Sequence, residues 1–430
     1  LPIVVGQLGM IILGLADTIM IGHHSTEELA AAAFVNNVFN LAIIFATGFS
    51  YGLTPLIGML QGGGNTQGIG RVFRNALAAN ASVAVLLTAV MYTVYCFVDK
   101  LGQPEELLPH IRPYFVLQLI SLLFIMLFNG FRQFAEGLTD TRTPMWILLG
   151  GNALNIFGNY LLIYGSFGFP EWGLFGAGVS TLVSRIVMLL VFIGVVAVAR
   201  RYKVYREAIL RSRFNRNDFI QLNALGWPIA LQMGMETAAF SLSAIMVGWL
   251  GSIPLAAHQI MISVSTIGFM VYYGMGAALA VRVSHFMGQK DFPNLRRAVN
   301  SGMGIILSLA IVASLFFYLV RTPIIYSFTE DHEVMIVVSS LIFSLIVYQF
   351  GDALQITFAN ALRGTTDVKP MMWIAFFSYF IVALPVGYLC GFTWGGGVVG
   401  VWVAFPAGLF TAGFLFWLRF RYRLQQLMKK

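Results

Sequence analysis

The sequence predicts an all-α integral membrane protein with about twelve transmembrane helices in two six-helix lobes. Three observations lead to this prediction. The composition is strongly apolar, about twelve apolar runs are long enough to cross a bilayer, and the first half of the chain matches the second.

The composition indicates that lipid surrounds most of the chain. Of the 430 residues, 58% are hydrophobic and only 10% are charged, and the mean hydropathy is +0.80. A soluble domain usually carries about 25% charged residues. A single soluble core of this length has no place for so much apolar surface. The composition therefore excludes an ordinary soluble protein.

The apolar runs between polar breaks predict about twelve spans, because a bilayer core needs about 20 apolar residues per helix. Strands are disfavoured, since the runs are long and do not alternate between apolar and polar residues. The runs begin near residues 2, 30, 74, 110, 143, 174, 219, 254, 296, 334, 370 and 397.

The distribution of basic residues predicts the topology, because cytoplasmic loops carry an excess of Lys and Arg. Connections after even-numbered runs are basic, whereas those after odd-numbered runs are mostly acidic or neutral. Both termini are therefore expected in the cytoplasm. The net charge of +8 follows from this topology and from attraction to anionic lipid, so nucleic acid is not an expected partner. The connection after the sixth run carries Arg200, Arg201, Lys203, Arg206, Arg211, Arg213 and Arg216.

The internal repeat predicts two lobes of the same fold. At an offset of 226, residues 19–22 (Ile-Met-Ile-Gly) fall on residues 245–248 (Ile-Met-Val-Gly), and at 227 the segment 137–140 falls on 364–367. Six spans per copy is an even number, so both copies enter the membrane in the same direction. This arrangement gives a pseudo-two-fold axis along the membrane normal, as in secondary transporters. We expect an N-lobe at 1–199, a basic linker at 200–218 and a C-lobe at 219–430.

The first predicted lobe carries one acid well inside a span. Asp17 lies in the first apolar run, where a charge costs about 2.5–3.5 kcal/mol on insertion scales. It is either satisfied by a neighbouring hydroxyl or amide, or it binds Na⁺ or H⁺, since oxygen ligands suit a hard cation. Asn155 and Asn159 lie on one face of the fifth run and could add neutral oxygens. Their alternative role is hydrogen bonding between helices.

The second predicted lobe carries two acids inside spans. Glu236 lies in the seventh run with no basic residue near it in sequence. Asp352 lies in the tenth run, and Tyr348 precedes it by one turn on the same helix face. A tyrosine hydroxyl beside a carboxylate can coordinate a cation or relay a proton, although Tyr348 could also be an ordinary packed aromatic residue.

Four other ionisable residues receive weaker interpretations. Glu136 is expected at a solvated cytoplasmic helix end, and Arg185 is expected to pair with an acid or to extend towards the membrane surface. His23 and His24 are expected to be solvated in the first outward loop. The sequence has no P-loop for ATP hydrolysis and no clustered catalytic residues, so we predict that the protein is not an enzyme.

At these residues the chain resembles the multidrug and toxic compound extrusion (MATE) family, in its NorM-like branch. The resemblance covers essentially the whole chain in order. The matching pieces include Ala-Asp-Thr-Ile-Met at 16–20, Leu-Asn-Ile at 154–156, Pro-Ile-Ala at 228–230, Ala-Ala-His-Gln at 256–259, Tyr-Gln-x-x-Asp at 348–352 and Leu-Arg-Gly-x-x-Asp at 362–367.

The resemblance implies a multidrug efflux antiporter that works by rocker-switch alternating access. Such a protein expels amphipathic, often cationic compounds in exchange for inward Na⁺ or H⁺. By position, Glu236, Tyr348 and Asp352 match the family's C-lobe cation site. Asp17, Asn155 and Asn159 match its N-lobe site, where the resemblance also places Thr181. Na⁺ would bind at these same residues, and no other cofactor is implied.

From these expectations we predict the partners and the location of the protein, and we keep one alternative function. The partners are small-molecule drugs and organic cations, together with the lipid bilayer, and we expect a monomer in the bacterial inner (plasma) membrane. The alternative function is a lipid-linked oligosaccharide flippase of similar architecture. Such a flippase should line its cavity with several basic residues for a pyrophosphate group, whereas Arg185 is the one basic residue that the sequence places well inside a span.

Overall fold

The computed structural model describes residues 1–328 and 331–429. Those residues form helices and connecting turns, with no β-strand among them. Twelve helical segments of this part of the chain are long and apolar enough to cross a membrane, as predicted. They are Pro2–His24, Thr26–Gly62, Thr66–Cys96, Glu105–Gly137, Arg142–Ile163, Gly173–Val198, Arg216–Gly248, Ser252–Gln289, Phe292–Leu319, His332–Gly364, Lys369–Thr393 and Gly397–Met428.

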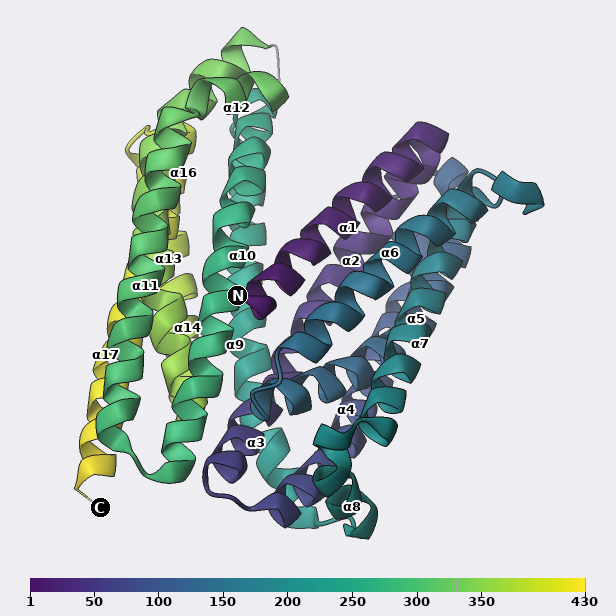
Figure 1. Ribbon diagram of the computed structural model, residues 1–430. Coiled ribbons are helices and arrows are strands. Elements are labelled where there is room, and N and C mark those ends of the chain that lie inside the picture. Colours follow the sequence, from purple (N-terminus) through teal and green to yellow (C-terminus); the bar gives the residue numbers. More distant parts are fainter. Residues whose placement is uncertain (329–330, 430) are drawn as a thin grey trace. The chain divides into compact units, whose positions relative to one another are not determined.

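The chain divides into two compact units, and the first comprises Pro2–Ala230. Helix α6 contacts α1 and α7, and α5 contacts α2, α4 and α7; α1 and α6 run side by side in Figure 1. The helices are α1 (Pro2–His24), α2 (Thr26–Ser50), α3 (Leu53–Gly62), α4 (Thr66–Cys96), α5 (Leu108–Gly137), α6 (Arg142–Ile163), α7 (Gly173–Val198), α8 (Lys203–Arg211) and the start of α9 (Arg216–Gly248).

A core of large side chains joins the helices of the first unit. Phe39 of α2 and Phe115 of α5 are almost fully buried, and their ring centroids lie 4.7 Å apart in an edge-to-face arrangement. Their cluster includes Leu174 and Ala177 of α7. Close packing of this kind stabilises helix association where lipid removes most of the hydrophobic driving force.

The second unit begins at Leu231, inside helix α9. In this unit α13 contacts α10, α11 and α17. Two π-helical segments interrupt the eleventh span. The remaining helices are α10 (Ser252–Gln289), α11 (Phe292–Leu319), α12 (Arg321–Phe328), α13 (His332–Gly364), α14 (Lys369–Phe376), the π-helical η5 (Phe377–Ala383), α15 (Leu384–Tyr388), the π-helical η6 (Leu389–Thr393), α16 (Gly397–Trp402) and α17 (Ala404–Met428).

The sequence repeat corresponds to a repeated close approach of helices inside each unit. In the first unit a Cβ at Gly137 would lie 2.7 Å from the Cβ of Ile57, and in the second a Cβ at Gly364 would lie 2.7 Å from the Cβ of Val283. Real Cβ atoms do not approach so closely, so both positions require glycine. Val283 follows Ile57 by the repeat offset of 226.

The turns between spans repeat in the same way. Asn65 accepts a hydrogen bond from the Gly68 amide at the start of α4. Its counterpart Asp291 accepts one from the Asn294 amide at the start of α11. Asn and Asp are favoured at this position because their side-chain oxygens satisfy free amide groups of the first helical turn. The same kind of side-chain cap therefore begins the third span of each copy, from Asn65 in the first and Asp291 in the second.

The predicted linker at 200–218 forms a short 3₁₀ turn (η4, Arg200–Tyr202), α8 and the start of α9. It is attached to the first unit. The Tyr205 hydroxyl donates to Gln61 at 2.9 Å, and Arg71 pairs with Asp218 at 2.6 Å. The two compact units of the structure meet between residues 230 and 231. This division does not test the predicted lobe boundaries at 1–199 and 219–430, which stay a prediction.

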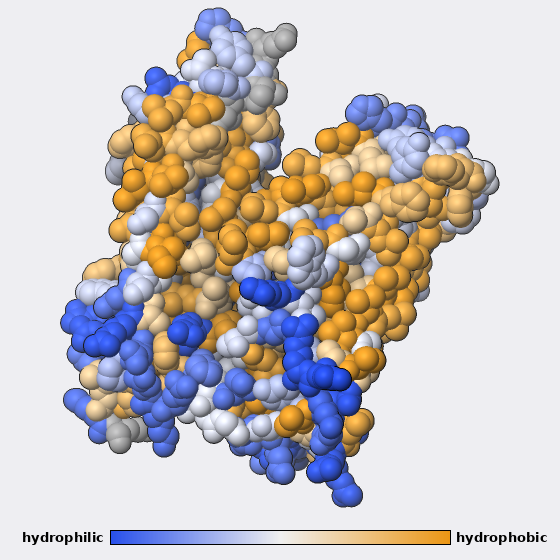
Figure 2. Space-filling view, viewed as in Figure 1, coloured by the Kyte–Doolittle hydropathy of each residue, from blue (hydrophilic) through white to orange (hydrophobic). Residues whose placement is uncertain are grey.

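The surface of the first unit matches a protein that spans a bilayer. Figure 2 shows apolar side chains over the middle of α6 and α7 and hydrophilic side chains gathered around α8. Large apolar residues such as Phe157 and Leu190 are more than half exposed. Exposed apolar side chains along a helix are stable when lipid, rather than water, covers them.

Candidate functional site

The four residues expected at a cation site in the first unit lie together in the structure. Asp17 of α1 accepts a hydrogen bond from the Asn159 amide of α6, with 2.6 Å between Oδ1 and Nδ2. Asn155 and Asn159 are buried, at 1% and 0% exposure, and Asp17 is half-buried. The spacing of four residues places both asparagines on one face of α6, opposite the carboxylate.

Asn155 connects this carboxylate to α7. One end of its amide lies 2.9 Å from Asp17 Oδ1 and the other lies 3.1 Å from the Thr181 hydroxyl. Hydrogen bonding is satisfied at both ends when the amide nitrogen donates to Asp17 and the oxygen accepts from Thr181. Asp17 thus receives amide donors from two residues, and the cluster joins α1, α6 and α7.

The acids of the second unit lie on α9 and α13. Glu236 Oε2 accepts hydrogen bonds from the Gln232 amide at 2.9 Å and from the Gln355 amide at 3.1 Å. Gln355 follows Asp352 by one turn of α13, and the charge of Glu236 acts on Asp352. The two acids therefore belong to one electrostatic cluster across α9 and α13.

Asp352 is the least satisfied polar group of this cluster. Its side chain is 1% exposed, and neither carboxylate oxygen has a hydrogen-bond partner in the described part of the chain. Tyr348 is also buried and packs edge-to-face against Phe240 and Phe405. An unpartnered carboxylate in a low-dielectric interior is strongly unfavourable unless a proton or a cation neutralises it.

The structure adds polar residues that the sequence interpretation missed. Gln232 links Glu236 to Arg363, whose guanidinium donates to the Gln232 carbonyl oxygen at 2.8 Å. A signal existed in the sequence, because Gln232 precedes Glu236 by one helical turn on the same face. No basic residue lies near Glu236 in the sequence. In the structure, however, Gln232 links Glu236 to Arg363.

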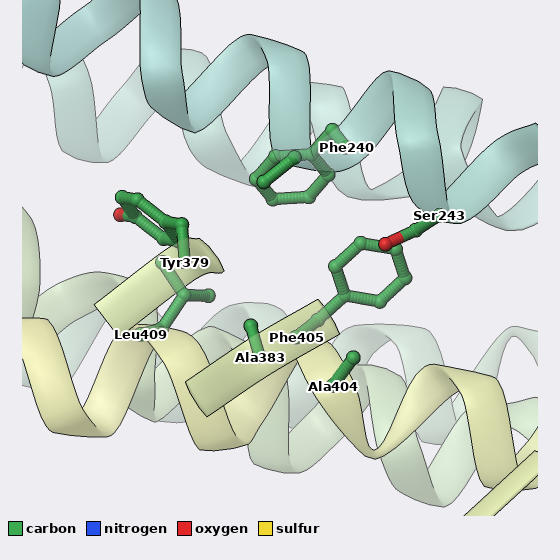
Figure 3. Close-up of a pocket in the computed structure, with 8 residues that line it drawn as sticks. Phe240, Ser243, Tyr379, Ala383, Ala404, Phe405 and Leu409 are labelled. Carbon is green, nitrogen blue, oxygen red and sulfur yellow. The ribbon is translucent and has the colours of Figure 1, made fainter. Parts of the chain in front are cut away.

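An apolar pocket lies beside the acids of the second unit. Figure 3 shows Phe240 of α9 pointing towards Tyr379, Ala383 and Phe405, which come from η5 and α17. Ser243 also lines this pocket. Phe240 follows Glu236 by one turn of α9, so an aromatic surface and a carboxylate lie next to each other on this helix.

One weaker expectation from the sequence is wrong, and a second is met only in part. Glu136 is not solvated: its side chain is 3% exposed and pairs with Arg132 at 2.8 Å, because the end of α5 packs against α3. Arg185 is half-buried and forms no ion pair within 4.0 Å among the described residues, although its charge acts on Asp17. It donates to Gln118 at 3.1 Å and to Ser121, so neutral oxygens of α5 hold the guanidinium.

The adjacent histidines differ from each other. His23 is exposed, as expected, but the His24 side chain is only 19% exposed and contacts Glu28 at 2.7 Å and Glu171 at 3.0 Å. The expectation of solvation was therefore wrong for His24. Pairing with Glu171 spans 147 residues of sequence, so no local pattern contains it.

The atoms of both clusters that could bind a cation are oxygens of carboxylates, amides and hydroxyls. No group of three or more His, Cys, Asp or Glu side chains that would hold a metal ion occurs within residues 1–328 and 331–429. The clusters offer at most two acids together with neutral oxygens. Such a donor set suits a monovalent hard cation or a proton better than a transition metal.

Comparison with known proteins identifies the family. The MatE family model matches residues 2–161 and again residues 228–389. The chain belongs to the MATE family. The two matches begin at residues that differ by the repeat offset, which supports the duplication found in the sequence. Members of this family are multi-pass membrane transporters, not enzymes.

Individual relatives agree with this MATE assignment. The chain is 30% identical over 436 aligned positions to the multidrug resistance protein NorM of Photobacterium profundum, covering 98% of this chain and 93% of that protein. A Vibrio cholerae MATE transporter, VcmN, shares 18% identity at a TM-score of 0.89, with 100% and 96% of the two chains covered.

A further MATE structure shows the same fold. An outward-facing multidrug resistance MATE transporter of the MOP superfamily shares 21% identity with this chain at a TM-score of 0.90, covering 100% of this chain and 95% of the other. At this identity the likeness concerns the fold alone. The architecture is therefore that of a MATE transporter from end to end.

Proposed function

We propose that this MATE protein is a multidrug efflux antiporter that exports amphipathic, often cationic compounds in exchange for inward Na⁺ or H⁺. The observation that supports the proposal most strongly is the pair of unpartnered carboxylate oxygens on Asp352, buried inside a span. The family match and the NorM relative favour drug efflux over the flippase alternative.

Asp352 provides a reason for cation entry. A buried unpaired carboxylate is destabilised by several kcal/mol as an ion, and this cost is removed when a proton or a cation binds. Glu236 lies near enough to add its negative charge, which makes an incoming cation still more favourable. Glu236, Tyr348 and Asp352 would therefore form the cation site of the C-lobe.

Asp17, Asn155, Asn159 and Thr181 would form a second cation site in the N-lobe. Here the carboxylate is already solvated by amide donors, and a cation would rearrange these groups so that the amide oxygens face it. Na⁺ is the metal ion proposed at both sites, and H⁺ is the alternative coupling ion.

The proposed transport cycle is alternating access by rocking of the two lobes. Cation binding and drug binding must favour different conformations, since a ligand shifts an equilibrium only by its differential affinity for the two states. A cationic drug is attracted by ionised acids and released when the coupling cation neutralises them.

The proposal includes a location and an oligomeric state. The basic connections after even-numbered spans support cytoplasmic termini in the bacterial inner membrane, and we propose a monomer as the transporting unit.

The test is dye efflux from proteoliposomes in which Na⁺ and H⁺ gradients are imposed separately. Wild-type protein should export the dye in response to at least one gradient. Asp17→Asn, Glu236→Gln and Asp352→Asn should each weaken that response, whereas Glu105→Gln, which changes an exposed acid, should not. Unchanged gradient-driven efflux in all three variants would show that the mechanism is wrong.

A further inference from the structure

One histidine joins the last residue of α1 to two other parts of the first unit. His24 Nδ1 lies 2.7 Å from Glu28 Oε2 on α2. On the other side of the same ring, Nε2 lies 3.0 Å from Glu171 Oε1, in the connection before α7. Both partners are carboxylate oxygens, which accept hydrogen bonds but do not donate them when ionised.

This geometry specifies the protonation state in which both bonds exist. A neutral imidazole carries one N–H, so it can donate to one of the two carboxylates but not to both. We infer that His24 is a positioning residue for α1: as an imidazolium it bridges Glu28 and Glu171 and holds the end of α1 against α2 and the connection before α7.

The Glu28 side of the bridge is held independently of His24. The Glu28 side chain is 9% exposed, and its Oε2 also accepts from the Leu174 amide at 2.9 Å, at the start of α7. Gly173 has a left-handed backbone (φ +52°), and any Cβ there would overlap the Glu28 carboxylate. The backbone of α7 is thus shaped around this acid.

When His24 loses a proton, the hydrogen bond to Glu171 should break rather than the one to Glu28. Its side chain is 65% exposed, so water can replace the lost hydrogen bond at little cost. Imidazole ordinarily loses its proton at about pH 6.5. Raising the pH on the side where α1 ends should therefore free the connection at 165–172 while Glu28 stays in place.

The other groups around His24 do not replace either carboxylate. His110 of α5 faces Glu28 at 3.7 Å, and Tyr164 at the end of α6 has its ring centroid 6.3 Å from that of His24. On α1 itself, His23 contacts the Ile19 carbonyl. His110 and His23 are histidines near the bridge that do not form it, so they serve as controls.

The bridge matters for the proposed site because of its place on α1. Asp17 precedes His24 by two helical turns on the same face, and α1 contacts α6, which carries Asn155 and Asn159. Fixing the end of α1 therefore fixes the helix that presents Asp17 to those amides. The bridge itself is independent of the proposed function, whereas its effect on efflux rests on it.

The first experiment measures the bridge without transport. Amide hydrogen exchange of residues 165–173, corrected for intrinsic rates, is followed in the purified full-length protein at about pH 5.5 and about pH 8. Wild type should be protected several-fold more at the lower pH. His24→Gln and Glu171→Gln should lose this difference, while His23→Gln and His110→Gln keep it. Glu171 is exposed, so its variant tests the bridge even if His24→Gln folds poorly.

Two results would overturn the inference. One is an absence of pH-dependent protection in the folded wild type, and the other is its persistence in Glu171→Gln.

The second experiment measures efflux as a function of pH on the side where α1 ends, with the opposite pH and the Na⁺ gradient held constant. The rate should change with pH in wild type and in His23→Gln and change less in His24→Gln and Glu171→Gln. Identical pH profiles in all four proteins would contradict the positioning role. Failure of the proposed function would instead appear as full efflux in the Asp17, Glu236 and Asp352 variants, with the exchange result unaffected.

Discussion

Helix α1 of the first unit and helix α13 of the second each carry an aspartate into the membrane, and the two carboxylates have opposite surroundings. Asp17 accepts from Asn159 and lies beside the amide of Asn155. Asp352 is more deeply buried and has no hydrogen-bond partner among the described residues. The chain itself supplies hydrogen bonds to the first carboxylate and, among the residues that the structure describes, none to the second.

This difference arose within one repeated fold. The position equivalent to Asp17 in the second copy is Ser243, which lines the apolar pocket. The position equivalent to Tyr348 in the first copy is Ser121, which accepts from Arg185. Backbone contacts such as those of Gly137 and Gly364 are the same in both units. Duplication therefore preserved the packing, while the polar side chains diverged to give one satisfied site and one unsatisfied site.

The largest expected effect separates the two aspartates in transport. Asp352→Asn should lower cation-driven efflux by at least about tenfold, equivalent to about 1.4 kcal/mol, because it removes the charge that attracts the cation. Asp17→Asn should have a smaller effect, since its remaining amide oxygen still accepts from Asn159. Initial rates in proteoliposomes measure both, and equal losses would remove the contrast between the sites.

The next effect tests the packing that the two units share. Gly137→Ala and Gly364→Ala should each lower the free energy of unfolding by about 1–3 kcal/mol, because the added Cβ overlaps Ile57 or Val283. Gly150→Ala is the matched control, since nothing lies within 4 Å of its added Cβ and alanine favours a helix. Denaturation of purified protein in detergent measures all three. A large loss for one glycine alone would show that the units pack differently.

The third effect compares the stability roles of the same two acids. Asp17→Leu leaves the Asn159 amide without its acceptor and should cost about 1–3 kcal/mol. Asp352→Leu removes a buried group with no partner and should cost less or even stabilise the protein when no coupling cation is bound. Thermal unfolding in detergent without Na⁺ measures the difference. Greater destabilisation by Asp352→Leu would mean that Asp352 has a structural partner.

The smallest effect concerns a turn outside the membrane. Burial alone raises the pKa of the Asp140 carboxyl, but hydrogen bonds from Thr143 and Tyr202, together with the Arg201 guanidinium, hold that pKa below its ordinary value of 3.8. This acid therefore contributes stability that is present above the ordinary value and lost as the pH falls through the lower folded value.

Asp140→Asn tests this contribution. It should reduce the loss of stability between about pH 5 and about pH 3, by less than about 1 kcal/mol. Unfolding measured at both pH values gives the result. Glu106→Gln, an exposed acid, should leave the acid dependence unchanged, and an Asp140→Asn protein as acid-sensitive as wild type would contradict the prediction.

The candidate site was partly predictable because its residues carry local signals. Asp17, Glu236 and Asp352 are acids within apolar runs, which is costly enough to attract attention, and Asn155 with Asn159 shows helical spacing. Glu136 was misjudged because its partner Arg132 and the packing of α3 bury it. The sequence interpretation did not single out Gln232, because a glutamine within a span is readily explained as a hydrogen-bonding link between helices.

The sequence by itself determined the solvent, the spans and the duplication. These properties depend on composition, on the length of apolar runs and on the order of residues, all of which are local or additive. It also placed the acids within spans, because a span and its charges can be read from the same run of residues.

Only the tertiary structure decided which carboxylates have partners. Asp17 meets Asn159 across 142 residues, and His24 meets Glu171 across 147. Asp352 meets no hydrogen-bond donor in the described chain. Hydrogen bonds require a separation of about 3 Å and a defined direction, and helix packing sets both. The difference between a carboxylate with hydrogen-bond partners and one without them therefore arises from how the helices pack.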